Sequence, residues 1–334
     1  MATTIKDVAR LAGVSTATVS YVINNSASVS EETRERVLAA IKQLDYHPNV
    51  VAKSLQGRRT NTIGFILSSK MRRISDPFFV ELISGIADEA ANHGFYLLLS
   101  SCPQGAQEGE VYRELIKTGR VDGLIVADTR INDERLSYLI RERAPFVAFG
   151  RADRDLDFPY VDVDGFAGVY EGVQHLIARG HRRIGLIKIP EELVCAGHRF
   201  AGYRAALQDN GLAFDRALVR QGDLSQDSGY RAMADLLDST SPSAVMVCSD
   251  VMAFGAMTAV REQGLKVGQD VAVVGFDDIQ MAAHSHPPLT TIRQPIYDIG
   301  TRLVRMLIQL LTEGEVEERH VILKPTLVVR RSSG

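Results

Sequence analysis

The pattern of apolar and polar positions divides the chain into two parts. Up to about residue 60, apolar residues recur at helical spacing in three short segments. Over the rest of the chain, runs of apolar residues alternate with amphipathic segments. The first pattern predicts a small helical module, and the second predicts strands separated by helices.

The helical module carries start and stop signals. Thr4 and Asp7 have the spacing of a capping box, in which each side chain can bond a free amide at the helix start. Gly13 suits the left-handed residue that ends a helix. Ser15 is expected to cap a second helix and Ser30 a third.

The second helix is predicted to have an apolar inner face and a polar outer face. At about 100° per residue, Val19, Val22 and Ile23 point toward the core. The outward residues are Thr16, Ala17, Ser20, Tyr21 and Asn24. On the third helix, the residues predicted to point inward are Val37, Leu38, Ile41 and Leu44. Three short helices around one core, the second with a polar outer face, predict a helix-turn-helix.

Charge is distributed unevenly between the two parts. Residues 1–60 contain eight Lys and Arg against five Asp and Glu, a net charge of +3. Because the whole chain has a net charge of −3, the remainder carries −6. This asymmetry places positive potential on the module that would face phosphates, as expected for a DNA-binding module.

Over its whole length, the chain resembles the lactose repressor and galactose repressor family of bacterial transcription factors. The segments that carry the resemblance most specifically are Asp7-Val8-Ala9, Ala12-Gly13-Val14-Ser15, Thr18-Val19-Ser20, Asn24, Thr33-Arg34, Tyr46, Pro48-Asn49, Ala52 and Leu55. The resemblance implies a DNA-binding headpiece over residues 1–48 and a hinge helix with linker over 49–60. The residues expected to contact DNA are Thr4, Ser15, Thr16, Ala17, Thr18, Ser20, Tyr21, Asn24, Ser30, Asn49, Ala52, Leu55 and Gln56.

The hinge has a distinct role in this family. The stretch from Asn49 to Gln56, with Gly57 as a stop, is too short to be a stable helix alone. The family resemblance implies that it folds when two copies pair over DNA. Leu55 matches the wedge that enters the minor groove and kinks the duplex.

Tyr21 stands where the commonest family pattern has Arg. Because Tyr cannot make the bidentate contact that Arg makes to guanine, the sequence does not predict which base this residue would read.

The longer part is predicted to form an α/β fold. The expected strands are Thr62 to Leu67, Phe95 to Ser101, Gly123 to Ala127, Pro145 to Gly150, Ile184 to Ile189, Ala244 to Cys248, Val271 to Phe276 and Thr290 to Arg293. The expected helices are Phe78 to His93, Glu110 to Thr118, Phe166 to Ala178, Phe200 to Asn210, Tyr230 to Leu237, Met252 to Gln263 and Tyr297 to Leu311. Such repetition predicts parallel sheets with helices on both faces, in two lobes. The resemblance implies a periplasmic-binding-protein-like (type I) effector domain, with one lobe formed by residues 61–162 and 292–330 and the other by 163–291.

Ligands of open parallel sheets bind outside the carboxyl ends of the strands. Those ends supply Asp128, Phe149, Arg151, Ser249, Asp250, Asp277 and Asp278, with Asp76, Phe78 and Phe79 at the first loop. Polar groups beside aromatic rings suit a sugar. By resemblance, Arg199 matches the family's ligand-gripping arginine and Asp277 its main acid. The full expected effector site is Asp76, Phe78, Phe79, Asp128, Phe149, Asp164, Arg199, Leu224, Ser249 and Asp277.

Some family positions differ and bear on the ligand. Leu224 stands where the purine and lactose repressors carry a large aromatic ring, and Leu stacks a flat base less well. Ser249 replaces a frequent Asn before Asp250, and Gly165 replaces Asn after Asp164. These differences favour a sugar-like effector over a purine and leave the recognised hydroxyl pattern open.

Other classes of protein find little support. The sequence has no Gly-x-Gly-x-x-Gly, P-loop, Gly-x-Ser-x-Gly or His-Glu-x-x-His, so neither enzymatic activity nor a cofactor is expected. His284 and His286 have no further ligands beside them, so no metal site is expected. Three cysteines without CxxC, no signal peptide and no run of about 18 apolar residues lead us to expect a cytoplasmic protein that does not span a membrane.

We therefore expect a transcriptional repressor that leaves a palindromic operator when a sugar-like molecule binds between its lobes. Its expected partners are double-stranded DNA, the small-molecule effector and a second copy of the chain. A homodimer is the simplest assembly, because the sequence ends at Gly334 without an apolar heptad tail. The alternatives are a corepressor-dependent regulator of the purine-repressor type and a solute-binding protein of a transporter.

Overall fold

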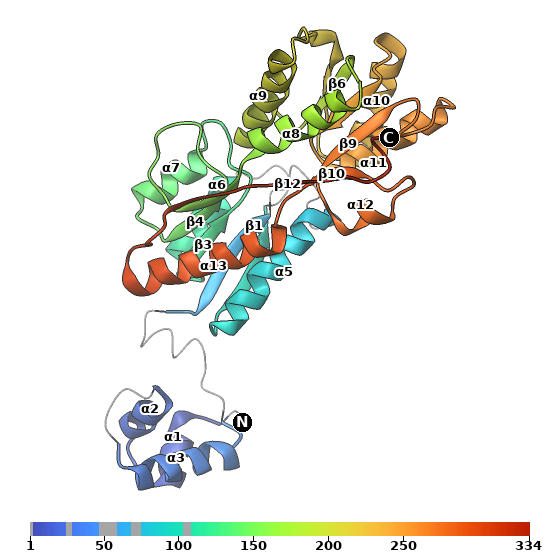
Figure 1. Ribbon diagram of the computed structural model, residues 1–334. Coiled ribbons are helices and arrows are strands. Elements are labelled where there is room, and N and C mark those ends of the chain that lie inside the picture. The colour runs from blue at the N-terminus through green and yellow to red at the C-terminus, as the bar shows by residue number, and fades with distance from the viewer. Residues whose placement is uncertain (1–2, 25–28, 47–58, 68–74, 103–107) are drawn as a thin grey trace. The chain divides into compact units, whose positions relative to one another are not determined.

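The structure is a computed structural model that describes residues 3–24, 29–46, 59–67, 75–102 and 108–334 (Figure 1). The chain divides into two compact units, Met1–Thr60 and Asn61–Gly334, and each is described by itself. Within the described ranges, no helix combines the length and the apolar character needed to cross a membrane.

The first unit contains the predicted helix-turn-helix. Its helices are α1 (Ile5–Ala12), α2 (Thr16–Asn24) and α3 (Glu31–Gln43). The capping box at Thr4 and Asp7 is present, and Gly13 ends α1 with φ 64°. Ser15 Oγ accepts a hydrogen bond from Thr18 N at 3.1 Å, and Ser30 Oγ accepts one from Thr33 N at 3.4 Å. Both predicted caps are therefore confirmed.

One residue of this unit was predicted wrongly. Leu38 is 51 % exposed, whereas Val37 is fully buried. Ala40 lies on the inner face of α3 instead, whereas Ile41 and Leu44, which directly follows the helix, pack against the core as predicted. Consecutive helical residues are turned by about 100°, so Leu38 points away from the inner face, in the middle of which Val37 lies.

The second unit contains two lobes. The first lobe is built on a sheet in which all neighbouring strands are parallel, in the order β11-β5-β4-β3-β1-β2. Its strands are β1 (Thr62–Leu67), β2 (Tyr96–Ser101), β3 (Gly123–Val126), β4 (Phe146–Phe149), β5 (Tyr160–Val163) and β11 (His320–Leu323). Its helices are α5 (Pro77–Asn92), α6 (Glu108–Lys117), α7 (Glu134–Arg141) and α13 (Ile296–Glu313).

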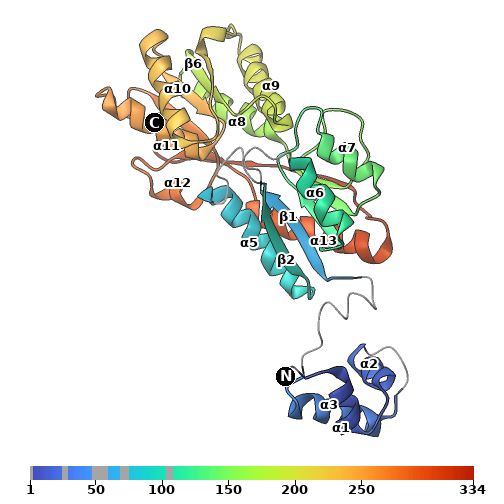
Figure 2. The same ribbon diagram turned by 180° about the vertical axis from the view of Figure 1, so that it is seen from behind.

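Alternating strand residues bury the two faces of this sheet separately. On β1, Ile63, Phe65 and Leu67 pack with residues of α5 and α13, whereas Ile66 packs with residues of α6 and α7. Successive side chains of a strand point to opposite faces of its sheet, so both faces of this sheet are apolar and both are covered by helices, as predicted (Figure 2).

The second lobe is built on a sheet with the order β12-β10-β9-β8-β6-β7, and β12 alone is antiparallel to its neighbour. Its strands are β6 (Ile184–Lys188), β7 (Val219–Gln221), β8 (Ala244–Val247), β9 (Ala272–Asp277), β10 (Thr290–Arg293) and β12 (Thr326–Val328). Its helices are α8 (Gly165–Ala178), α9 (Val194–Asp209), α10 (Gln226–Ser239), α11 (Asp250–Glu262) and α12 (Gln280–His284), with a 3₁₀ turn at Arg216–Leu218. Helix α8 packs against α9, and α10 packs against α11.

The expected limits of the lobes need correction after residue 291. Ile292 pairs with Phe276 of β9, and β12 pairs with β10, so residues 292–293 and 326–328 belong to the second sheet. The chain thus crosses between the sheets three times: after β5, after β10 and between β11 and β12. The sequence pattern indicated the strand at 290–293 but not the sheet in which it pairs.

Candidate effector pocket and DNA-reading helix

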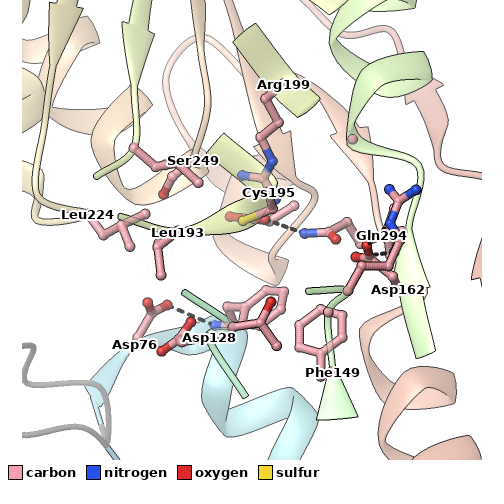
Figure 3. A pocket seen from close by; sticks show the side chains of 18 residues that line it. Asp76, Asp128, Phe149, Asp162, Leu193, Cys195, Arg199, Leu224, Ser249 and Gln294 are labelled. Carbon is pink, nitrogen blue, oxygen red and sulfur yellow. Dashed lines mark hydrogen bonds and ion pairs between the residues drawn. The ribbon is translucent and has the colours of Figure 1, made fainter. Parts of the chain in front are cut away.

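A pocket lies between the two lobes, where the carboxyl ends of both sheets face each other (Figure 3). It encloses about 740 Å³ of space free of protein atoms, counting the part that is open to solvent. Its lining residues are Asp76, Phe78, Asp128, Thr129, Phe149, Gly150, Arg151, Asp162, Val163, Gly165, Ile189, Leu193, Cys195, Arg199, Leu224, Ser249, Asp277 and Gln294. A site at this edge agrees with the rule for open parallel sheets.

Arg199 is a buried cation in the wall of this pocket. It belongs to α9 and is only 9 % exposed. Its Nη1 donates a 2.7 Å hydrogen bond to the carbonyl oxygen of Cys248, and its guanidinium carbon lies 3.8 Å from the ring centroid of Phe276. Its Nε is buried and has no hydrogen-bond partner among the described residues. An unpaired buried donor is costly, so a ligand acceptor would be stabilising here.

Gly165 leaves the room that Arg199 occupies. A Cβ atom at residue 165 would lie 3.1 Å from Arg199 Cγ, which is a tight contact. A side chain at residue 165 would therefore require the stem of Arg199 to move by a few tenths of an ångström. The departure noted in the sequence thus has a structural consequence inside the pocket.

Asp277 is a buried carboxyl at the end of β9, near Arg199. Burial raises its pKa well above the usual range, the charge of Arg199 lowers it, and the charges of Asp250 and Asp76 raise it. Nε2 of Gln294 donates a 2.7 Å hydrogen bond to Asp277 Oδ1. The backbone of Asp277 has φ 128°, a region that residues other than glycine rarely adopt. Such strain is frequent at ligand sites.

The first lobe supplies an aromatic surface. Phe78 and Phe149 stack at 5.9 Å between ring centroids with 20° between their planes. Asp76 caps the start of α5: its Oδ1 accepts a 3.0 Å hydrogen bond from Phe78 N, which fixes the first turn that carries the Phe78 ring. The second lobe supplies aliphatic side chains, among them Leu193 and Leu224. A ligand in the pocket would contact apolar groups from both lobes.

Hydrogen bonds join the lobes beside the pocket. Ile131 N donates to Glu192 O at 2.8 Å, and Val194 N donates to Thr129 O at 3.0 Å. Both bonds connect the loop after β3 in the first lobe with the end of the loop after β6 and the first residue of α9 in the second. The lobes are therefore closed over the pocket in this structure.

A buried ionic cluster supports the loop after β3. Arg135 donates to both carboxylate oxygens of Asp133 and, through Nη2, to Asp128 O at 2.8 Å. Glu108 accepts from Arg130 Nη1 at 2.5 Å. These bonds fix the backbone of the loop that places Asp128 in the pocket, where Asp128 has φ 54°.

The structure brings together most of the expected effector residues. Asp76, Phe78, Asp128, Phe149, Arg199, Leu224, Ser249 and Asp277 all line the pocket. Two expected residues do not. Phe79 is 2 % exposed and points into the core of the first lobe, where its ring lies 6.4 Å from that of Phe65. Asp164 caps α8 by accepting from Ala167 N at 2.9 Å, so its carboxylate is used by the helix start.

Sequence reasoning missed several lining residues. Asp162 lies on β5, a strand that was not predicted, and Gln294 directly follows β10. The strand-end rule applied to Thr290 to Arg293 would have found Gln294. Thr129, Leu193 and Cys195 lie in or just after loops that follow strands, where no local pattern marks a ligand contact.

The outer face of α2 agrees with a DNA-reading role. Thr16 and Ala17 are exposed, and Tyr21 is 47 % exposed, whereas Val19 and Val22 are buried. Thr4 and Ser15 use their hydroxyl groups in the caps of α1 and α2. The side chain of Asn24 and the expected contacts Asn49, Ala52, Leu55 and Gln56 lie outside the described residues. The DNA-contact assignments remain predictions.

Comparison with known proteins places the chain in a family. Residues 4–49 match the family described as "Bacterial regulatory proteins, lacI family", and residues 173–333 match "Periplasmic binding protein-like domain". The chain is 35 % identical over 333 residues to the HTH-type transcriptional repressor CytR of Escherichia coli K12, covering 99 % of this chain and 96 % of that protein. The chain belongs to the LacI family.

Other LacI-family members are similarly related. The HTH-type transcriptional repressor PurR of Erwinia tasmaniensis is 38 % identical over 98 % of this chain and 96 % of its own length. A structure titled "transcriptional regulator CelR-cellobiose complex" has a TM-score of 0.77 and 36 % identity, with 99 % of each chain covered. The lac repressor dimer bound to operator and the anti-inducer ONPF has a TM-score of 0.88 and 32 % identity, covering 100 % of this chain and 99 % of that one.

Family membership confirms the class of function predicted from the sequence. The chain is a helix-turn-helix transcriptional regulator with a periplasmic-binding-protein-like effector domain of two parallel-stranded lobes. Its family consists of transcriptional regulators rather than enzymes.

Proposed function

We propose that this LacI-family regulator is a repressor that a neutral, sugar-like molecule releases from its operator by binding between the lobes. The observation that carries the proposal is the buried Arg199 in the pocket wall, whose Nε has no acceptor among the described residues. A ligand hydroxyl is a suitable acceptor, and the carboxyl groups of Asp76, Asp128 and Asp277 could accept from others.

The shape of the apolar surface also favours a sugar. The stacked Phe78 and Phe149 offer ring faces on one side, and Leu193 and Leu224 offer aliphatic groups on the other. Sugar rings present C–H groups that pack on both kinds of surface while their hydroxyls reach polar groups. The CelR structure, by its title, holds cellobiose. We infer that this chain binds a sugar or a glycoside.

The second candidate is a corepressor-dependent regulator of the purine-repressor type. It is favoured by the 38 % identity to the repressor PurR. Against it, the second lobe presents Leu224 where an aromatic ring would stack on a base. In this case the ligand would strengthen operator binding instead of weakening it.

A thermal-shift screen of the full chain with sugars, glycosides, nucleosides and purines tests the ligand class. A ligand at about 100 times its Kd stabilises the folded protein by about 2.7 kcal/mol, which gives a clear shift. We expect a shift with a neutral sugar that Asp128→Asn reduces, because Asp128 lines the pocket. Glu318→Gln, an exposed carboxyl-to-amide change, should leave the shift unchanged. A shift with purines alone would support the second candidate.

We also propose that the regulator binds a palindromic operator as a homodimer and works in the cytoplasm, where the DNA is. The half-sites would be read by the exposed face of α2, including Tyr21. Selection from random duplexes with the wild type and Tyr21→Arg should give motifs that differ at one symmetric position. Lys6→Ala should weaken all sequences about equally. An unchanged motif with Tyr21→Arg would exclude Tyr21 from base reading.

A further inference from the structure

Arg151 connects the two lobes through a histidine that does not line the pocket. Arg151 follows β4 in the first lobe, and its Nε donates a 2.6 Å hydrogen bond to Asp162 Oδ2 on β5. Its Nη2 lies 3.2 Å from Nδ1 of His198, which belongs to α9 in the second lobe. Arg151 and Asp162 line the pocket, whereas His198 lies outside its lining. The contact therefore spans the lobes at the pocket wall.

The chemistry of this contact defines the protonation state of the ring. A guanidinium group has donors and no acceptor, so His198 Nδ1 must accept the hydrogen bond. The ring is therefore neutral and carries its proton on Nε2. A protonated ring would turn a second donor toward Arg151 and place two cations side by side.

Burial and the charged groups around His198 together also favour its neutral form. Burial lowers the pKa of His198, as does the charge of Arg151, while Asp162 and Asp164 raise it and Arg199 lowers it further. A depression on the outer side of the contact is lined by His198 together with the charged residues Asp153, Lys188 and Glu191. With all these groups present, the net effect is a lowered pKa, so closure of the lobes favours the neutral ring.

We propose that His198 is a positioning residue for Arg151, that its neutral ring holds the two lobes together, and that protonation of the ring releases this contact. The proposal goes beyond effector identity, and its test needs no effector. Asp162 fixes one edge of the guanidinium within the first lobe, so the His198 contact ties that fixed group to the second lobe.

The direction of the pH dependence follows from the two states of the lobes. When the lobes are apart, His198 is solvated and titrates near its ordinary pKa of about 6.5. When they are closed, its pKa is lower. Closure is thus favoured above the open-state pKa and is lost as the pH falls through about 6.5, by up to about tenfold per pH unit for one proton.

Two amides report closure directly. Ile131 N and Val194 N donate hydrogen bonds from one lobe to the other. Their hydrogen exchange, corrected for intrinsic rates, measures how often the lobes separate. We expect that protection of both amides in the full-length wild type falls several-fold between about pH 7.5 and about pH 5.5, because the ring gains its proton in this range.

Variants separate this role from a merely structural one. His198→Asn keeps an acceptor near the position of Nδ1 and does not titrate, so protection should not fall at acidic pH. His198→Lys carries a cation at every pH used and should show low protection throughout. His284→Asn, an exposed histidine on α12, should behave as the wild type. An equal fall in wild type and His198→Asn would overturn the proposal, as would amides that are unprotected at every pH.

Discussion

Arg199 shows how a single residue can serve both the fold and the ligand. A buried charge is tolerated only when it is paired and hydrogen-bonded. Here the Cys248 carbonyl oxygen, the Phe276 ring and the nearby Asp277 provide part of that compensation. The remaining donor, Nε, lacks a protein partner among the described residues. The protein therefore tolerates the buried charge of Arg199 without a ligand, and a ligand that accepts a hydrogen bond from Nε would stabilise it further.

Removing this cation should weaken effector binding strongly, while operator binding without the effector stays near the wild-type level. Arg199→Met keeps the aliphatic stem beside Phe276 and loses every donor. A charge-assisted hydrogen bond contributes about 1.5 to 3 kcal/mol, so ligand affinity should fall roughly tenfold to hundredfold. Calorimetry with the ligand found by screening measures the loss. Arg302→Met, an exposed change on α13, is the matched control. Normal affinity in Arg199→Met would mean that the pocket is misplaced.

Asp250 gives a residue-level prediction for pH. Burial raises its pKa to about 7, although hydrogen bonds from Thr291 and Ile279 lower it. Its carboxyl binds a proton more tightly in the folded state than in the unfolded chain. This contribution to stability is complete below about pH 4 and is lost as the pH rises through about 7.

We therefore expect Asp250→Asn to become more stable relative to the wild type as the pH rises. The neutral amide removes the cost of burying a carboxylate, at the expense of part of its hydrogen bonding. Thermal unfolding of both proteins between about pH 5 and about pH 8 checks this. A difference in Tm that stays constant across the range would contradict the raised pKa.

At the scale of elements, glycine sets the approach of α10 to α11. A Cβ atom at Gly255 would lie 1.9 Å from the carbonyl oxygen of Gln226, and one at Gly229 would lie 2.1 Å from that of Met252. Both neighbours are backbone atoms, which cannot move aside as a flexible side chain can. Close packing of these two helices therefore requires glycine at both positions.

Gly255→Ala should destabilise the protein by about 1 to 3 kcal/mol or more, because the two helices must separate. Gly197→Ala is the matched comparison: residue 197 is an exposed position on α9 with nothing within 4 Å of its Cβ. It should stabilise by roughly 0.5 to 1 kcal/mol, because alanine restricts the unfolded chain. Urea unfolding of both variants measures the two effects. Equal destabilisation would show that helix packing is not the cause.

Whether a helix or strand could be predicted from the sequence depended on its length and on its pattern of apolar residues. Long amphipathic helices such as α5 and buried central strands such as β1 were predicted almost at their observed limits. The missed elements are short: β5, β7, β11, β12, α7 and α12. β11, for example, has four residues, only one of which is buried, and it lies at a sheet edge. Such strands are specified by their neighbours more than by their own residues.

The same limit applies to the site. Residues at the end of a predicted strand, such as Phe149, or directly after one, such as Ser249, were found, because parallel strand ends meet at one edge. Phe79 was placed wrongly because it lies beside Phe78 in a helix start, and only the packing shows which ring enters the core. Arg199 came from family resemblance alone. Its unpaired Nε is a property of three-dimensional packing that no sequence pattern shows.

At the scale of the whole molecule, regulation requires that the ligand bind the two lobe arrangements unequally. A ligand with equal affinity for both would shift nothing, however tightly it binds. The closed lobes seen here, joined through hydrogen bonds of Ile131 and Val194, are one of the arrangements between which such a ligand would have to distinguish. Coupling in such systems is about 1 to 3 kcal/mol, so operator affinity should change by about five- to 150-fold.

The central claim is that the pocket ligand controls operator affinity. The most direct measurement is fluorescence anisotropy of a selected operator with the full chain, at fixed salt, with and without the ligand from the thermal-shift screen. We predict that the ligand weakens operator binding of the wild type by at least about fivefold and leaves Arg199→Met unchanged. An unchanged operator affinity in the wild type, or an equal change in Arg199→Met, would contradict the claim.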